Sequence, residues 1–209
     1  MKPPTAPAPA RITAGLMVLL ALTACAGPAE NTGSTSPSSS ASAASSPGLD
    51  SDAEAQAAFQ ARVDTLAAVD RTNPDRVAAA FTELITSWNT ITDGTETAAD
   101  TRAEPLMVPE LAERTVEPER NASQALWLEL QPFSAVSVPT LGEGVPSDAD
   151  EGTDSADIAY RNFRVTWSWQ SSEGKKVRDD ARTSNVFLVL TRSGGRWLVA
   201  DYVTEDLPA

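Results

Sequence analysis

The sequence predicts an α+β domain in which helices pack on one face of a curved antiparallel sheet. Up to about Trp88 the apolar residues recur at helical spacing, whereas from Ala135 onward they alternate with polar residues, as in strands. Short turns rich in Gly and Ser separate the later segments, so the strands should form a meander. Helices followed by an antiparallel meander are typical of an α+β fold.

The amino-acid composition argues against several classes of function. The 209 residues suffice for one domain with additional segments. Acidic residues outnumber basic ones by 29 to 16, which argues against nucleic acid as a partner. The chain has no histidine and one cysteine, so it lacks the commonest metal ligand and has no intrachain disulfide. We therefore expect neither a metal site nor a cofactor.

Residues 1–24 are predicted to be a lipoprotein signal peptide. Lys2 and Arg11 precede an apolar run at 15–22, which is shorter than the roughly 20 residues that span a bilayer. The tetrapeptide Leu22-Thr23-Ala24-Cys25 resembles a bacterial lipobox. This resemblance implies cleavage before Cys25 and a diacylglycerol on its sulfur. We expect a protein anchored by membrane lipid on the extracytoplasmic face of the cell membrane; an ordinary secreted protein is the alternative.

Residues 25–51 form a predicted linker. Serine, alanine and proline dominate this segment, and such a composition buries too little apolar surface to fold. A flexible chain of this length reaches about 25–30 Å. The linker is thus expected to act as a disordered tether for a globular domain at 52–209.

The first half of this domain is predicted to be helical. A weakly amphipathic helix is expected from Asp52 to about Asp70. Asn73 suits the N-cap and Pro74 the first turn of a clearer helix. Its apolar stripe consists of Val77, Phe81, Leu84, Ile85 and Trp88. Further short helices are expected at 98–107, 109–114 and 123–130.

The second half reads as strands, with a first short one at 135–138. Residues 158–170 alternate over a long run, but Ile158 and Tyr160 have the opposite parity to Phe163. This mismatch predicts a β-bulge near 161–162. A hairpin turn at 171–175 leads to an apolar central strand at 186–190. A turn at Gly194-Gly195 precedes the closing strand at 197–203.

An acidic stretch at 141–157 contains no Lys or Arg. An EF-hand loop requires glycine at its sixth position, whereas Gly152 is fifth when Asp148 is counted first. The stretch is therefore predicted to be a solvated loop. Cation binding by this loop is left open.

Three segments resemble the nuclear transport factor 2-like superfamily, and more narrowly its actinobacterial envelope lipoproteins and conjugal-transfer-associated members. They are the capped helix at 73–88, the segment Glu104-Pro105-Leu106-Met107-Val108-Pro109-Glu110-Leu111, and the end of the sheet at 190–202. The resemblance covers about residues 70–206. It implies a cone-shaped domain whose mouth can hold a catalytic acid.

Asp201 is the residue that would serve as this acid. It shares the strand parity of Trp197 and Val199, which would direct its carboxylate into an apolar cavity, with Tyr160 or Tyr202 as an oxyanion donor. Alternatively, Asp201 lies near the rim of the sheet and pairs with Arg192 or Arg196, or it faces water. A possible ligand pocket comprises Trp167, Trp169, Trp197, Asp201 and Tyr202. The bland alternative is that these tryptophans fill the core.

The sequence thus favours a non-catalytic envelope lipoprotein that acts as an assembly or recognition module. Its partner would be an envelope protein that the sequence does not identify. Two alternatives stay open: a binder of a small apolar ligand in the cone, and an isomerase- or cyclase-like enzyme using Asp201.

Overall fold

The computed structural model describes residues 48–116, 124–144, 152–178 and 181–208. The chain divides into two units, Met1–Ala44 and Ser45–Ala209, and the first lies wholly outside the described residues. The predicted signal peptide, Cys25 and the linker up to residue 47 therefore lie outside them as well. Among the described residues, no helix has both the length and the apolar character needed to cross a membrane.

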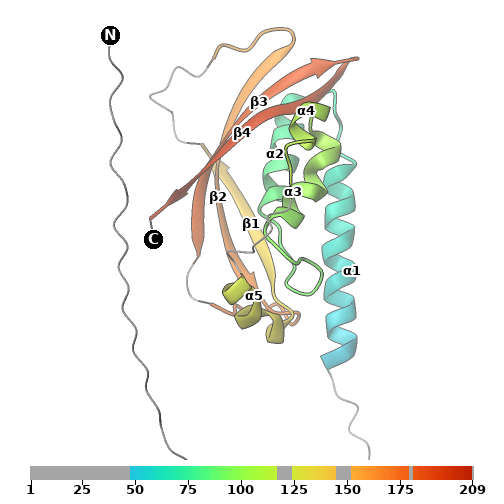
Figure 1. The fold of residues 1–209 in the computed structure, drawn as a ribbon, viewed down its shortest axis with the longest axis vertical. Helices are drawn as coiled ribbons and strands as arrows, with labels where there is room; N and C mark the ends of the chain where they lie inside the picture. Colours follow the sequence, from blue (N-terminus) through green and yellow to red (C-terminus); the bar gives the residue numbers. More distant parts are fainter. Residues whose placement is uncertain (1–47, 117–123, 145–151, 179–180, 209) are drawn as a thin grey trace, which may run out of the picture. The chain divides into compact units, whose positions relative to one another are not determined.

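The second unit has the predicted α+β architecture. Its helical elements are α1 (Gly48–Ala67), α2 (Pro74–Ile85), α3 (Thr97–Ala103), η1 (Glu104–Leu106), α4 (Pro109–Ala112), α5 (Gln124–Leu130) and η2 (Gln131–Phe133). Its strands are β1 (Val136–Glu143), β2 (Ile158–Gln170), β3 (Arg182–Ser193) and β4 (Arg196–Leu207). They form one curved antiparallel sheet in the order β1-β2-β3-β4. Figure 1 shows α1 to α4 on the same side of this sheet.

Helix α2 is the centre of the helical layer. As predicted, Asn73 caps it: its side-chain oxygen accepts hydrogen bonds from the backbone N–H groups of Asp75 and Arg76, at 2.9 and 3.3 Å. The apolar stripe is buried against the sheet, and Phe81 is fully inaccessible to solvent. Trp88, however, lies beyond the end of the helix at Ile85. The hydroxyls of Thr86 and Ser87 bond back to helix carbonyls and so complete the last turn.

Helix α1 begins and ends slightly earlier than the predicted range of 52–70. Its Phe59 and Val63 are buried against the rest of the helical layer. The predicted short helices at 98–107, 109–114 and 123–130 are present as α3 with η1, α4 and α5.

Strand β2 has the predicted bounds, but the predicted bulge near 161–162 is wrong. Its pairing with β3 keeps one register from Ile158 opposite Thr191 to Trp167 opposite Arg182. Ile158 and Tyr160 simply face the helix-free side of the sheet.

The register instead shifts between β3 and β4. Val189 lies opposite Asp201, whereas Leu190 lies opposite Val199, so Ala200 is an extra residue in β4. The alternation of side chains along β4 is therefore reversed beyond Ala200.

Both edges of the sheet are covered along part of their length. On β1, the backbone N–H of Ser137 donates to Trp88, and Asn89 forms a bridge to Val136. On β4, the N–H of Trp197 donates to Arg71, and the N–H of Val108 donates to Val199. The segments that connect the helices therefore pair with part of each sheet edge.

Candidate functional site

Asp201 does not point into a cavity, and this part of the prediction is wrong. The extra residue Ala200 turns its side chain to the opposite face from Trp197 and Val199. The carboxylate is 61% exposed and pairs with Arg114 at 3.2 Å. The alternative of a rim ion pair is closer to the observed position, although the partner is Arg114, just after α4, and not Arg192 or Arg196.

The same register shift directs the Tyr202 side chain toward the helical layer. Its ring packs edge-on against Phe81, with ring centroids 5.0 Å apart. Its hydroxyl donates a hydrogen bond to Asp100 of α3, at 3.0 Å. The structure therefore brings together Tyr202 and Asp100, a residue that the sequence analysis did not single out.

Burial perturbs both members of this pair. Desolvation raises the pKa of Asp100, and the negative charge of Glu96 adds to this, while the Tyr202 hydroxyl and Arg102 oppose it. Desolvation, followed by the charge of Asp100, raises the pKa of Tyr202 well above its ordinary value. The hydroxyl therefore stays protonated at neutral pH and serves as a donor to the carboxyl group.

We predict that Asp100→Asn stabilises the domain at pH 7. The pKa of Asp100 is higher in the folded than in the unfolded state, so above about pH 4 the folded state retains a proton that the unfolded state has lost. Its contribution to stability is thus lost as the pH rises through the folded-state pKa. The asparagine side chain is uncharged, so this loss of stability with rising pH disappears. Its amide oxygen can still accept the hydrogen bond from the Tyr202 hydroxyl.

Urea unfolding from pH 4 to pH 8 checks this prediction. The gain from Asp100→Asn should grow with pH and then level off. Asp201→Asn is the matched control, because an exposed pair with Arg114 contributes little to stability. A gain that is equal at pH 4 and pH 8 would contradict the proposed role of burial.

A groove with a volume of about 810 Å³ runs between α1 and the segment from residue 89 to α3. Its lining consists of Ala53, Gln56, Ala57, Phe59, Gln60, Asn89, Thr92, Asp93, Gly94, Ala98, Thr101 and Arg102. None of the residues of the predicted pocket belongs to it. The walls combine apolar side chains with amides, hydroxyls and one charged pair, and they lie elsewhere than the tryptophan-lined pocket that the sequence analysis gave as an alternative.

The charged pair of this groove is Asp93 with Arg102. Both terminal nitrogens of Arg102 donate to the carboxylate, at 2.6 and 2.9 Å, and one also donates to the carbonyl of Ser87. The Asp93 side chain is 3% exposed and also accepts from the backbone N–H of Asn89. The guanidinium carbon of Arg102 lies 5.3 Å from the centre of the Phe59 ring. The pair therefore ties α3 to the loop after α2 and to α1.

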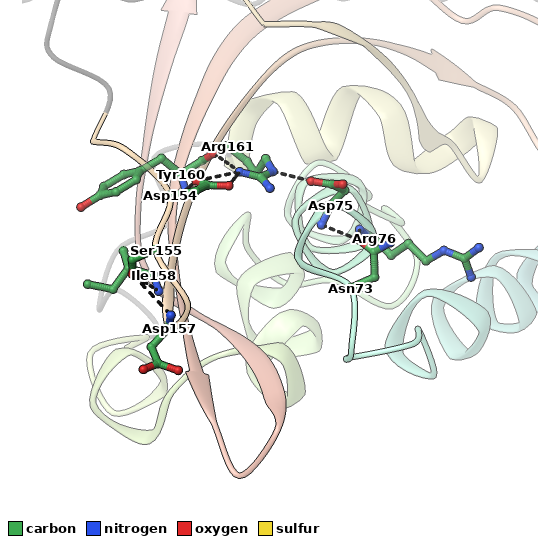
Figure 2. Close-up of polar contacts among 9 residues, drawn as sticks. All are labelled: Asn73, Asp75, Arg76, Asp154, Ser155, Asp157, Ile158, Tyr160 and Arg161. Carbon is green, nitrogen blue, oxygen red and sulfur yellow. Dashed lines mark hydrogen bonds and ion pairs between the residues drawn. The ribbon is translucent and has the colours of Figure 1, made fainter.

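A second ionic bridge joins the acidic stretch to the helical layer. Figure 2 shows Arg161 between Asp154 and Asp75, with Asn73 at the start of the same helix. Asp154 also accepts from the N–H of Tyr160, and this bond, followed by that from Arg161, lowers its pKa. The carboxylate of Asp154 is thus engaged by protein donors.

Part of the acidic stretch, residues 145–151, lies outside the described residues. Within the part of the chain that the structure describes, no three acidic or cysteine side chains are placed to hold a metal ion. At the end of the described part, a Cβ at Gly152 would lie 2.3 Å from the Tyr160 ring, so only glycine fits there without a shift.

The tryptophans of the predicted pocket lie in the core. Trp167 and Trp197 belong to the larger core cluster, and Trp169 belongs to a smaller one with Trp127. Trp88 links the clusters, with ring centroids 5.6 Å from Trp167 and 6.3 Å from Trp169. These rings fill the space between helices and sheet, as the bland alternative supposed.

No family model matches this chain, and neither a curated protein nor a solved structure matches it.

Proposed function

We propose that this protein is a lipid-anchored, non-catalytic binding module on the extracytoplasmic face of a cell membrane. One observation carries the proposal: the tetrapeptide ending at Cys25 follows directly on an apolar run of signal-peptide length. A diacylglycerol on Cys25 supplies the two acyl chains that stable anchoring requires.

The folded unit supports a binding role over catalysis by Asp201. The carboxylate of Asp201 is exposed and paired with Arg114, so it lacks the enclosed apolar site that the catalytic hypothesis required. The tryptophans that would have lined a ligand cavity are packed among core side chains. We therefore propose that the domain acts by binding a partner at its surface.

We further propose that the domain is a cone of the nuclear transport factor 2-like type. The support is the curved four-stranded sheet with helices α1 to α4 on one side (Figure 1). The capped helix α2 and the closing β3–β4 hairpin, which carried the sequence resemblance, pack on each other through Phe81 and Tyr202.

We predict that Cys25→Ala moves the protein out of the membrane fraction or leaves it unprocessed, because the acyl acceptor is lost. Fractionation of cells that express the full chain, with mass spectrometry of its N-terminus, measures both outcomes. Ser34→Ala in the linker is the matched control and should leave membrane association unchanged. Unchanged membrane partitioning of Cys25→Ala, or an unmodified sulfur in the natural protein, would contradict the proposal.

A further inference from the structure

We infer that one end of the folded unit docks on the surface of a bilayer that contains anionic phospholipid. This end is called the α5 tip below, and it is defined by Ile91, Leu128, Phe133, Lys175 and Lys176. These residues come from the loop after α2, from α5, from η2 and from the β2–β3 connection. The inference rests on the proposed lipid anchor and deepens it, since it states how the anchored domain is oriented.

Exposed apolar side chains gather at the α5 tip. Ile91 is 39% exposed, Leu128 63% and Phe133 51%, and these are three of the six large apolar side chains that are exposed among the described residues. The N–H of Thr90 donates to the carbonyl of Ala135, at 3.0 Å, so the loop that carries Ile91 lies beside the end of η2. Exposed apolar groups that gather in one place are typical of a contact with a membrane or with a protein.

Two lysines border these apolar side chains. Lys175 and Lys176 are exposed, and they are the only lysines of the chain beyond the predicted signal peptide. The N–H of Ser172 donates to the carbonyl of Phe133, at 3.3 Å, which joins the lysine-bearing connection to η2. Lysine side chains extend along apolar surface and place their ammonium groups beside lipid phosphates. An apolar centre with a basic border suits the surface of an anionic bilayer.

The sequence segments around the α5 tip carry no net charge. The whole chain has a formal net charge of −13. Residues 124–135 and 170–182 together contain four acidic and four basic residues. The acidic character of the protein therefore does not oppose the approach of this end to anionic lipid.

The attachment point of the tether favours the same end. Helix α1 begins at Gly48, and Figure 1 shows this start at the end of the sheet where α5 lies. Residues 26–47 connect it to Cys25, and a flexible chain of this length reaches about 25 Å. The tether thus holds the α5 tip close to the bilayer. At the resulting high effective concentration, weak contacts with lipid suffice.

The β3–β4 turn lies at the opposite end of the sheet. Strand β3 runs from the β2–β3 connection to this turn over 12 residues, which at roughly 3.3 Å per residue is about 40 Å. When the α5 tip contacts the bilayer, the β3–β4 turn is therefore out of reach of groups within the lipid.

Quenching by lipid tests the inference on the full lipidated chain. The thioether expected at Cys25 blocks that sulfur, so a thiol-reactive fluorophore labels an introduced cysteine alone. Gln131→Cys places the label in η2, and Ser193→Cys, also at an exposed position, is the matched control at the β3–β4 turn. The vesicles contain equal parts of phosphatidylcholine and phosphatidylglycerol with brominated acyl chains. Quenching should be at least about threefold stronger for Gln131→Cys, because docked apolar groups lie about 5–10 Å into the boundary between headgroups and acyl chains.

Serine substitutions test the apolar side chains. In the Gln131→Cys background, Leu128→Ser with Phe133→Ser should lower the quenching to the level of Ser193→Cys. Val116→Ser with Val203→Ser is the matched control, because these side chains are 72% and 55% exposed and lie outside the α5 tip. The urea midpoint of each variant verifies that the fold is retained. Equal quenching in both double variants would overturn the inference.

Charge reversal tests the lysines. In the Gln131→Cys background, Lys175→Glu with Lys176→Glu should weaken the quenching, and so should vesicles of phosphatidylcholine alone. Arg192→Glu with Arg196→Glu changes the net charge by the same amount at the β3–β4 turn and should have little effect. A loss of the same size from both charge reversals would overturn the inference.

The outcomes separate this inference from the proposed function. Flotation with the vesicles and mass spectrometry of the N-terminus report the anchor, whereas the difference in quenching between Gln131→Cys and Ser193→Cys reports the contact. Anchored protein with equal quenching at both positions would overturn the contact and leave the anchor standing. Protein without acyl chains that fails to float would overturn both.

Discussion

Replacing Arg102 by Ala should destabilise the domain by about 3–5 kcal/mol, because it leaves the Asp93 carboxylate buried without a counter-charge. With Arg102 in place the side chain of Asp93 is 3% exposed, so its charge is balanced by Arg102 and not by solvent. The remaining bonds to Asp93, from Asn89 and Thr92, do not neutralise its charge. Urea unfolding at pH 7 measures the loss.

A double-mutant cycle separates the ion pair from lost packing. Arg102→Met retains an apolar side chain over Phe59, and Asp93→Asn removes the buried charge. The two together should cost less than the sum of the single changes by roughly 1–3 kcal/mol, as is found for residues in direct contact. Additive single losses, or a loss below about 1 kcal/mol for Arg102→Ala, would contradict the role of the pair.

Phe81→Ala should also cost about 3–5 kcal/mol, since Phe81 is fully buried between α2 and the sheet. The change removes the edge-on contact with Tyr202 and leaves a cavity beneath the hydrogen bond to Asp100. The urea midpoint should therefore fall sharply.

Two controls accompany this prediction. Phe81→Leu retains most of the volume and should lose much less stability. Phe133→Ala removes the same side chain from η2, where it is 51% exposed, and should have a small effect. Equal losses for Phe81→Ala and Phe133→Ala would contradict the placement of Phe81 in the core.

Features with local causes were predictable from the sequence. The cap of α2 depends on Asn73 and on backbone groups two and three residues away. The β3–β4 turn depends on Gly194 and Gly195, which have φ values of 58° and 80°. Both signals lie within a few residues, so residue type suffices to identify them.

The position of Asp201 was not predictable in this way. It depends on a register shift at Ala200, which is set by how β4 pairs with β3 and by the segment that covers its edge. No glycine or other turn signal marks Ala200, and simple alternation therefore assigned Asp201 to the wrong face.

The two buried pairs escaped prediction for a different reason. Asp100 and Tyr202 are 102 residues apart in the chain, and only the packing of the helical layer against the sheet brings them together. Asp93 and Arg102 are near in sequence, but each is an unremarkable residue of a turn or helix until α1 covers them. The spacing of these residues in the sequence therefore does not predict either pair.

The partly closed sheet edges limit one route by which copies of the protein could associate. Many copies held at high density would meet edge to edge, which is how strands recruit one another into fibrils. Here Arg71 and Val108 occupy one edge of β4, and Pro139 lacks the N–H that an incoming strand would need at β1. At these positions the backbone groups of the sheet edge are already paired or absent, so an incoming strand would find fewer hydrogen-bond partners.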